Sequence, residues 1–428
     1  MKKVKKNIHN NTWFRLDNAG TVFPGQNTQT WSNVIRVSIK LKDAVDPDLL
    51  LEATKRCLPR FPTMAVRIRN GFFWHYLEKN PEQPVVLPEA NNPCLRIKYN
   101  ENNRYLFRIF YYKNRISLEI FHALTDGYGA FTFLATITAE YLRLRGYSVP
   151  AGGMVLDINE EPKPEEIEDS FVKYASKTGK ERIPMFKTYH RKGKRMPKHT
   201  SIVTTGYLPV DRVKEKAKEY GVTITEYLAG ILMYLHIQFQ KNENMLQKDV
   251  CMQIPVNSRN QFPSKTLRNF SVNYNLRIDP NWGDYTFEEV LRHLSLSLRL
   301  TNNPKHLSVM FAANIAMEKN PFMRFIPLFV KDLAVGIVFA FSAEKTTTAL
   351  FTNLGVANIP DEMKEHITTA TLMPSPGRLN GARVGAVTLG DKMAVTFANM
   401  YTNTDIEREF FRFLIKEGIP VKIESNKC

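Results

Sequence analysis

The sequence lacks the spacings and runs that define several classes of protein. Its four cysteines, Cys57, Cys94, Cys251 and Cys428, lie far apart, which argues against both a zinc site and a disulfide framework. No apolar run reaches the roughly 18 residues that a membrane-spanning helix needs, because charged residues and a proline interrupt the most apolar stretch, 322–343. We therefore predict no bound metal and no transmembrane segment, and we expect a buried helix in that stretch.

Motifs of several other chemistries are also missing. The chain has no Gly-x-Ser-x-Gly turn of the kind that presents a hydrolase nucleophile. It has no zinc-finger spacing, helix-turn-helix signal or aromatic RNA-binding signature, so we predict no nucleic-acid partner. The basic start, Met1–Lys6, runs into a polar stretch and not into an apolar one, so we expect no secretory signal and a cytoplasmic location.

What the chain does have is enough length and apolar content for two cores. It has 428 residues, of which 43% are hydrophobic, and single cores seldom grow beyond roughly 250–300 residues. Residues 160–200 are charged, weakly periodic and rich in proline, as a crossing between domains would be. We predict an N-terminal domain at 1–165, a connector at 166–200 and a C-terminal domain at 201–428. Each half has an α/β pattern in two layers, an α+β arrangement of helices on an antiparallel-rich sheet.

The net charge is strongly positive, +17 at pH 7. Such a charge suits nucleic acid, an anionic membrane surface, a phosphorylated ligand or an acidic carrier protein, and charge alone does not choose among them. The basic residues are spread along the chain, which equally fits simple solubility. The densest group, Arg191–Lys198, falls in the predicted connector.

Three local patterns indicate secondary structure in the N-terminal half. Residues 35–41 alternate apolar and polar side chains, which predicts a half-buried strand. Asp46 and Pro47 are typical of a helix start, with the aspartate as cap and the proline in the first turn. Asn70 and Gly71, between two apolar segments, predict a tight hairpin turn with positive φ angles.

One histidine stands at the end of a predicted strand. Ile116, Leu118 and Ile120 share one face of that strand, and strand parity places His122 on the same inward face. A neutral histidine in a partly dry site can take a proton from an alcohol or amine, because its pKa lies near working pH. A lone histidine is, however, more often a packed or surface residue, so spacing alone leaves both interpretations open.

Asp126 and Gly127 follow in the loop after the strand. Glycine lets the backbone approach closely and allows a helix to begin near Tyr128. Aspartate before such a helix start is an ordinary cap, which is the structural alternative to a role at a site.

Four segments in order resemble a known superfamily. Phe121–Gly127 carries a His-x-x-x-Asp-Gly motif similar to that of chloramphenicol acetyltransferases, nonribosomal peptide condensation domains and alcohol acetyltransferases. Trp13–Pro24 and Ile254–Phe270 resemble segments of bacterial alcohol-acetyltransferase-like proteins, and Phe351–Gly355 is similar to their Ser-Asn-Leu-Gly strand. The resemblance covers most of the chain, and these proteins are the closest match within the superfamily.

The resemblance implies two similar domains in a V-shaped arrangement with a tunnel between them. His122 would lie midway along the tunnel as the general base. Asp126 would be turned away from the substrate and paired with an arginine, for which Arg259 is our candidate because a buried carboxylate needs a charged or hydrogen-bonded mate. A solvated loop position is the alternative for Arg259.

The same resemblance implies donors for the oxyanion of a tetrahedral intermediate. Thr352 and Asn353 are the candidates, with turn residues at a strand end as the alternative. Ser271 and Asn269 are further candidates to line the tunnel from the second domain.

Departures from the family pattern narrow the prediction. Condensation domains usually carry two adjacent histidines, and here Phe121 replaces the first. The Asp-Phe-Gly-Trp-Gly motif of plant acyltransferases is absent, and Thr352 stands in place of the serine of the Ser-Asn-Leu-Gly strand. The replaced histidine disfavours peptide condensation without excluding it, the absent motif argues against the plant branch, and threonine keeps the hydroxyl of the serine.

We therefore predict an acyltransferase that moves an acyl group from acyl-CoA, as co-substrate, to a small-molecule alcohol or amine. No bound cofactor, metal or covalent enzyme intermediate is expected. The alternatives are an acyl carrier protein as donor, in condensation or lipid acylation, and a catalytically inactive binding protein of the same fold. One chain suffices to form the tunnel, so a monomer is sufficient and a dimer stays open.

Overall fold

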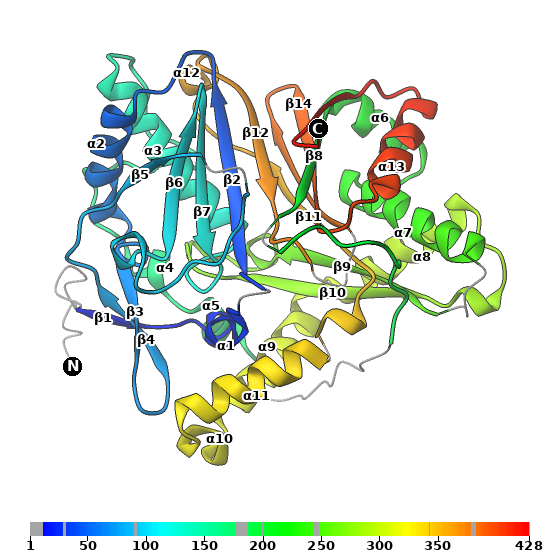
Figure 1. The fold of residues 1–428 in the computed structure, drawn as a ribbon, viewed down its shortest axis with the longest axis horizontal. Coiled ribbons are helices and arrows are strands. Elements are labelled where there is room, and N and C mark those ends of the chain that lie inside the picture. The colour runs from blue at the N-terminus through cyan, green and yellow to red at the C-terminus, as the bar shows by residue number, and fades with distance from the viewer. Residues whose placement is uncertain are drawn as a thin grey trace.

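The computed structural model describes residues 12–28, 31–89, 92–176, 187–198, 200–243, 248–341, 343–377 and 382–427. The chain forms two lobes side by side, each built on a β-sheet with helices on its outer side (Figure 1). The two-layer α/β architecture predicted from the sequence is confirmed. The boundary at 166–200 stays a prediction, and residues 177–186 and 199 of that connector lie outside the described residues.

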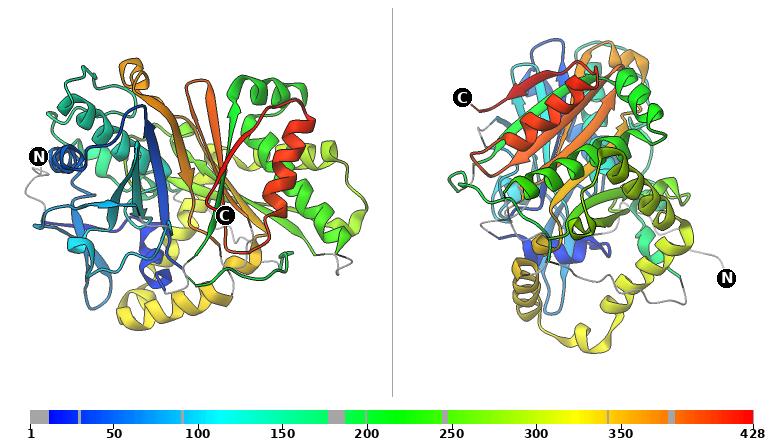
Figure 2. Two further views of the ribbon diagram at one scale, coloured as in Figure 1. Left: turned by 45° about the horizontal axis from the view of Figure 1, so that its top comes forward. Right: turned by 90° about the vertical axis from the view of Figure 1, so that its right-hand side faces the viewer.

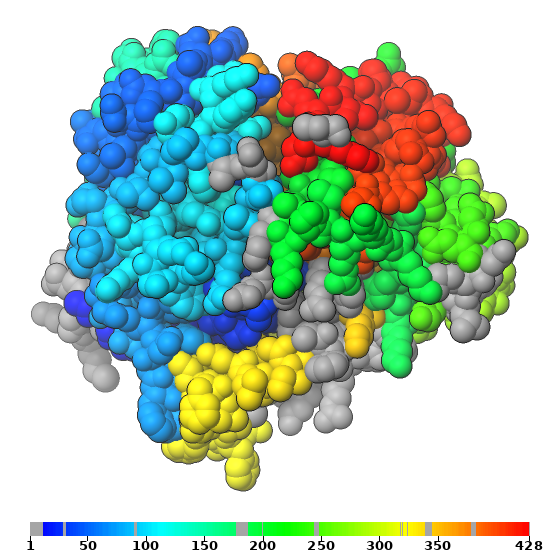
Figure 3. All heavy atoms as spheres, in the orientation of Figure 1, coloured from blue at the N-terminus to red at the C-terminus, as the bar shows by residue number. Residues whose placement is uncertain are grey.

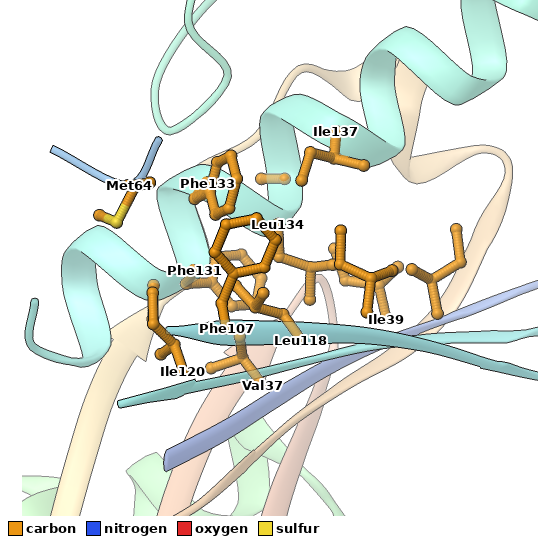
Figure 4. Close-up of a cluster of buried hydrophobic side chains, with 14 of the residues drawn as sticks. Val37, Ile39, Met64, Phe107, Leu118, Ile120, Phe131, Phe133, Leu134 and Ile137 are labelled. Atoms are coloured by element: carbon orange, nitrogen blue, oxygen red, sulfur yellow. The ribbon is translucent and has the colours of Figure 1, made fainter. Parts of the chain in front are cut away.

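The N-terminal lobe contains a five-stranded sheet in the order β12-β2-β7-β6-β5. Its strands are β2 (Val34–Leu41), β5 (Val86–Pro88), β6 (Phe107–Tyr112), β7 (Arg115–Phe121) and β12 (Ile367–Met373). Two helices, α2 (Pro47–Cys57) and α3 (Gly127–Leu144), cover one face, and aromatic and aliphatic side chains of α3 pack on the sheet (Figure 4). A smaller sheet in the order β1-β4-β3 comprises β1 (Trp13–Arg15), β3 (Val66–Asn70) and β4 (His75–Lys79).

The C-terminal lobe contains a seven-stranded sheet in the order β10-β9-β11-β13-β14-β8-β15. Its strands are β8 (Ile202–Pro209), β9 (Val250–Asn257), β10 (Ser271–Ile278), β11 (Ala349–Val356), β13 (Arg383–Leu389), β14 (Lys392–Asn399) and β15 (Lys422–Ser425). This lobe includes the helices α6 (Val210–Glu219), α7 (Ile224–Asn242), α8 (Phe287–Thr301) and α13 (Asp405–Lys416). Their apolar faces form a second core with the strands.

One strand ties the lobes together. The chain leaves the C-terminal sheet after β11, pairs β12 antiparallel with β2 in the N-terminal sheet, and returns as β13. No sequence pattern predicted this return. The remaining helices are α1 (Phe23–Gln26), α4 (Pro164–Ile167), α5 (Ser170–Tyr174), α9 (Pro304–Lys319), α10 (Pro321–Phe325), α11 (Leu328–Phe341) and α12 (Asp361–Lys364).

The local predictions for the N-terminal half hold in part. Helix α2 begins at Pro47, and the Asp46 carboxylate accepts hydrogen bonds from two backbone N–H groups of its first turn. β2 forms as predicted, but it is buried on both faces and not on one. Its Arg36 is buried because the guanidinium pairs with Glu89 at 2.7 Å and Glu119 at 3.1 Å, and these charges satisfy one another inside the lobe.

The hairpin between β3 and β4 forms, but its turn differs from the prediction. Neither Asn70 nor Gly71 has a positive φ. The loop is wider, and the Gly71 N–H donates to the carbonyl oxygen of Trp74 at 2.9 Å. Phe72, Phe73 and Trp74, which follow the predicted turn, therefore lie in the loop and not in β4.

The prediction of a buried helix in 322–343 is wrong. The stretch forms two helices, α10 and α11, that lie at one edge of the molecule next to α1 (Figures 1 and 2). Several of their large apolar side chains are exposed, among them Phe322 and Phe329. Among the helices of the described residues, none is both long enough and apolar enough to cross a membrane.

Candidate active site

His122 lies at the end of β7, where the chain turns toward α3. Its backbone N–H donates to the carbonyl oxygen of Asn33 at 2.9 Å, and this bond holds His122 next to the first residue of β2. The imidazole stacks on the ring of Phe23 from α1, with ring centroids 4.8 Å apart and planes 22° apart. The residue is partly buried, and its ring plane is fixed by a neighbour from another part of the chain.

The hydrogen bonds of Asn269 determine the tautomer of this histidine. The Asn269 Nδ2 amide donates to the backbone oxygen of His122 at 3.0 Å and to the carboxylate of Asp17 at 3.1 Å. All these partners are acceptors, so the other end of the amide, Oδ1, must face His122 Nδ1, 3.0 Å away. An amide oxygen accepts only, and Nδ1 therefore carries the proton. Nε2 is left with the lone pair of the neutral ring.

Asp17 stands behind Asn269 and is fully buried. Its carboxylate accepts hydrogen bonds from the backbone N–H of Gly20 at 2.6 Å and of Asn269 at 3.2 Å. Burial raises the pKa of Asp17 from 3.8 to about 6, although the Arg268 guanidinium 3.6 Å away opposes the shift. The carboxylate thus holds Asn269 in place through these hydrogen bonds.

Burial has the opposite effect on the histidine. It lowers the pKa of His122 below its ordinary value of 6.5, because the packed surroundings disfavour the charged imidazolium. The hydrogen bond from Nδ1 to Asn269 and the more distant charge of Asp126 limit the shift. The ring is consequently neutral at pH 7, with a free lone pair on Nε2.

Asp126 faces away from the imidazole and is saturated by donors. It caps α3 through the N–H of Gly129 at 3.2 Å, and it accepts from the Phe270 N–H at 2.9 Å and from the Ser271 hydroxyl at 3.0 Å. Arg259 completes the set with Nη1 at 2.8 Å. Burial would raise the pKa of Asp126, but the guanidinium and the N–H donors outweigh it and hold the pKa below its usual range.

Arg259, the partner expected from the sequence, is itself fixed from several sides. Its guanidinium donates to the carbonyl oxygens of Thr266 and Arg268, and it lies 4.7 Å from the centre of the Tyr128 ring. The arginine thereby ties the segment before β10 in the C-terminal lobe to the start of α3 in the N-terminal lobe. Asp126 and Arg259 serve the architecture of the loop that carries His122.

The close backbone approach expected at Gly127 occurs two residues later. Helix α3 begins at Gly127, and a Cβ there would make only ordinary contacts with Leu354 and Leu372. At Gly129 an added Cβ would overlap the Leu267 carbonyl oxygen and the Thr125 hydroxyl. The crowded glycine is therefore Gly129, where the two lobes meet at the first turn of α3.

The residues expected to line the site from the second domain divide between two roles. Asn269 contacts His122, whereas Ser271, two positions on, donates to Asp126. Asn353 does not reach the histidine: its Nδ2 donates to Thr225 at 3.0 Å and its Oδ1 accepts from the Gly355 N–H at 2.9 Å. Thr352, its neighbour on β11, points to the opposite face of the sheet by strand parity.

Sequence reasoning assigned no role to Phe23, which stacks on His122, or to Asp17, which bonds to Asn269 behind it. Both lie in the segment Trp13–Pro24, whose resemblance to the family was the only available signal. Among the described residues, no group of three or more His, Cys, Asp or Glu is arranged to hold a metal ion.

No protein-family model matches this sequence, and a comparison with curated proteins finds no significant relative. Solved structures do match. Polyketide synthase associated protein 5 from Mycobacterium tuberculosis superposes with a TM-score of 0.60 at 14% identity, over 94% of this chain and 96% of that one. Trichothecene 15-O-acetyltransferase from Fusarium sporotrichioides gives a TM-score of 0.59 at 10% identity, over 94% and 93% of the two chains.

A third match is the starter condensation domain of rhizomide synthetase, solved as a variant in complex with C8-CoA. It gives a TM-score of 0.59 at 11% identity, over 94% of each chain. The protein therefore has the same two-lobed fold as these three solved structures, and this is the fold that the sequence motifs predicted.

Proposed function

We propose that this protein is an acyltransferase that moves an acyl group from acyl-CoA to an alcohol or amine, with His122 as the general base. The observation that carries the proposal is the arrangement of Asn269, which holds the proton on Nδ1 and leaves Nε2 as the acceptor. The lowered pKa of His122 supports it, because a base must be neutral at working pH. The fold supports the general class of reaction.

In the proposed reaction, Nε2 takes the proton of the acceptor hydroxyl or amine as its oxygen or nitrogen attacks the thioester carbonyl carbon. The new bond gives a tetrahedral oxyanion, and its collapse breaks the carbon–sulfur bond. The departing thiolate takes the proton back from the imidazolium, which releases free thiol and restores the neutral ring. Asp126 takes no part in these transfers, because its oxygens are committed to Arg259 and to backbone and hydroxyl donors.

Thr352 is the better candidate for an oxyanion donor. The side chain of Asn353 is committed to Thr225 and Gly355, on the side of β11 that faces α7. Thr352 lies on the other face, and its register partner Gly385 is packed against β12, the strand that belongs to the N-terminal sheet. This face of β11 adjoins a strand of the other lobe's sheet, which supports Thr352 as the donor.

The donor is proposed to be CoA-linked because the surplus of positive charge suits the phosphates of that nucleotide. One structural neighbour was solved with C8-CoA, which favours the same donor class. The same charge and fold also suit an acidic acyl carrier protein, which is the second candidate donor.

The test is thiol release from acetyl-CoA and octanoyl-CoA with a panel of alcohols and amines, for wild type and His122→Ala. We expect turnover with at least one pair, and a loss of about a hundredfold or more in the variant, the usual size for removal of a general base. The control is His293→Gln, a partly buried histidine on α8 that bonds to the Arg277 carbonyl oxygen. This control should keep wild-type activity.

Two results would count against the proposal. If wild type releases no thiol with any pair but accepts acyl groups from a carrier protein, the donor assignment is wrong. If His122→Ala keeps full activity, the general base is another group.

A further inference from the structure

We infer that α10, α11 and the loop between β3 and β4 form a docking surface for a lipid membrane with anionic headgroups. The surface, which we call the apolar patch, consists of large exposed apolar side chains from these three segments. They are Phe72, Trp74, Phe322, Phe325, Phe329 and Leu333. Their exposed fractions run from 54% to 86%. Contiguous exposed apolar side chains on a folded protein mark an interaction site.

Helix α11 has the reverse of the usual polarity of a surface helix. Its only charged residues are Lys331 and Asp332. Both face the protein: Lys331 Nζ donates to the Phe73 carbonyl oxygen at 2.8 Å, and the Asp332 carboxylate lies 3.0 Å from His75 Nε2. A surface helix in water normally presents its charged face to solvent and its apolar face to the core. Here the apolar face is outside.

The inner side of these helices is already satisfied, so their exposed face is not the result of incomplete packing. The Leu328 N–H donates to the Phe72 carbonyl oxygen at 2.9 Å, and the rings of Phe73 and Phe325 make an edge contact at 6.2 Å. On the other side, Val335 of α11 lies 3.1 Å from the position that a Cβ on Gly25 would occupy. The helices are therefore held in place with their apolar side outward.

The shape and the charge of the region both favour a membrane as the occupant. α10 and α11 form a convex ridge at the lower edge of the molecule, beside the β3–β4 hairpin (Figures 1 and 3). Aromatic and aliphatic side chains on a convex edge suit insertion into the headgroup region, where aromatic rings are enriched. Arg324 is exposed between Phe322 and Phe325, and the chain carries a net charge of +17, which complements anionic headgroups.

The apolar patch is joined to the candidate active site by a short path. α11 packs on α1, and Phe23, the first residue of α1, stacks on the His122 imidazole. If His122 is the general base, the docked membrane lies close to the active site and can supply an acyl chain or acceptor that is dissolved in it. This last step rests on the proposed function, whereas membrane docking itself does not.

The experiment is co-flotation of the full chain with vesicles of about 70% phosphatidylcholine and 30% phosphatidylglycerol, and with vesicles of phosphatidylcholine alone. The patch variant is Phe325→Asp with Leu333→Asp. The matched control is Trp282→Asp with Leu300→Asp, which changes two equally exposed apolar residues of the C-terminal lobe. All four positions are on the surface, and thermal unfolding of each variant verifies that the fold is kept.

We expect wild type and the control to float with the phosphatidylglycerol vesicles, less with phosphatidylcholine alone, and the patch variant to lose at least about tenfold in partitioning. Equal flotation of the patch variant and the control would overturn the inference, as would no flotation of wild type.

Size-exclusion chromatography with light scattering tests the rival occupant, a second copy of the chain. If wild type is a dimer that does not bind vesicles, and the patch variant is a monomer, the patch binds a second copy of the chain. That result would overturn the inference of a membrane. Thiol release is measured separately, so a failure of the proposed chemistry leaves this result intact.

Discussion

Two buried carboxylates flank the loop that carries His122, and they behave in opposite ways. Asp126 is paired with Arg259 and three further donors, which hold its pKa below the usual range against the effect of burial. Asp17 is as deeply buried, but its nearest cation, Arg268, lies 3.6 Å away, and burial raises its pKa to about 6. Burial alone therefore does not decide the protonation of an acid. The nature and distance of its partners do: Asp126 bonds directly to a guanidinium, whereas Asp17 bonds to the N–H groups of Gly20 and Asn269.

The largest effect predicted from this comparison is on stability. Replacing Asp126 with alanine leaves the Arg259 guanidinium buried without its carboxylate, which should cost about 3–5 kcal/mol of the free energy of unfolding. Urea denaturation of wild type and Asp126→Ala measures the difference. The control is Asp361→Ala, a carboxylate at the exposed start of α12 that pairs with Lys364, and it should change stability little. A similar small change for both variants would mean that Asp126 and Arg259 do not act as a buried pair.

The second effect is a pH dependence of opposite sign for the two acids. A raised pKa means that folded Asp17 holds its proton more tightly than the unfolded chain does, so its contribution is fully present below 3.8 and is lost as pH rises through about 6. At about 1.4 kcal/mol per pKa unit, the loss amounts to roughly 2–3 kcal/mol. Asp126 has a lowered pKa, so its contribution is present above 3.8 and is lost as pH falls through its lower folded value.

The contribution of Asp17 to the free energy of unfolding is measured by urea unfolding at pH values between 4 and 7. Wild type and Asp17→Asn are compared at each pH. The amide cannot ionise, so the stability difference between the two proteins should grow in favour of the variant as pH rises. Taking the difference cancels the contribution of His122, which is present in both. A constant difference across the range would show that Asp17 does not titrate there.

The third effect separates the neighbours Asn269 and Ser271, which serve different carboxylates. Asn269→Ala removes the acceptor that holds the proton on His122 Nδ1, and kcat should fall about 10- to 100-fold through loss of ring orientation, with KM little changed. Ser271→Ala removes one of the donors to Asp126 and should cost about 1 kcal/mol of stability with activity nearly intact. Equal losses of kcat in the two variants would contradict the distinction between Asn269, which bonds to His122, and Ser271, which bonds to Asp126.

The sequence predicted those parts of the site that depend on local rules. The strand of β7, the Asp126 cap and the start of α3 follow from parity and capping chemistry over a few residues. Asp17 could not be found this way, since it meets Asn269 from 252 positions away. No periodicity connects two such segments, and only the completed packing of the lobes shows that they touch.

The same limit explains two of the errors of fold. An apolar run predicts that a helix is apolar, but it does not say which side faces the protein, and in α11 the two charges turn inward to Phe73 and His75. β2 was predicted to be half-buried because its alternate residues are polar. The partner charges of Arg36, on β7 and before β6, allow that face to be buried as well.

The smallest effect concerns Phe23, which lies in the same N-terminal segment as Asp17 and contacts the histidine ring directly. Phe23→Leu keeps an apolar neighbour but removes the stacked ring, an interaction of about 0.5–1.5 kcal/mol, so kcat should fall by no more than about tenfold. The smaller side chain admits water, which raises the pKa of His122 back toward 6.5 and moves the acid limb of kcat/KM to higher pH, since only the neutral ring is active. Phe23→Tyr, which keeps the stacked ring, should leave the limb where it is in wild type. An unshifted acid limb in Phe23→Leu would mean that the Phe23 ring does not contribute to the burial that lowers the pKa of the base.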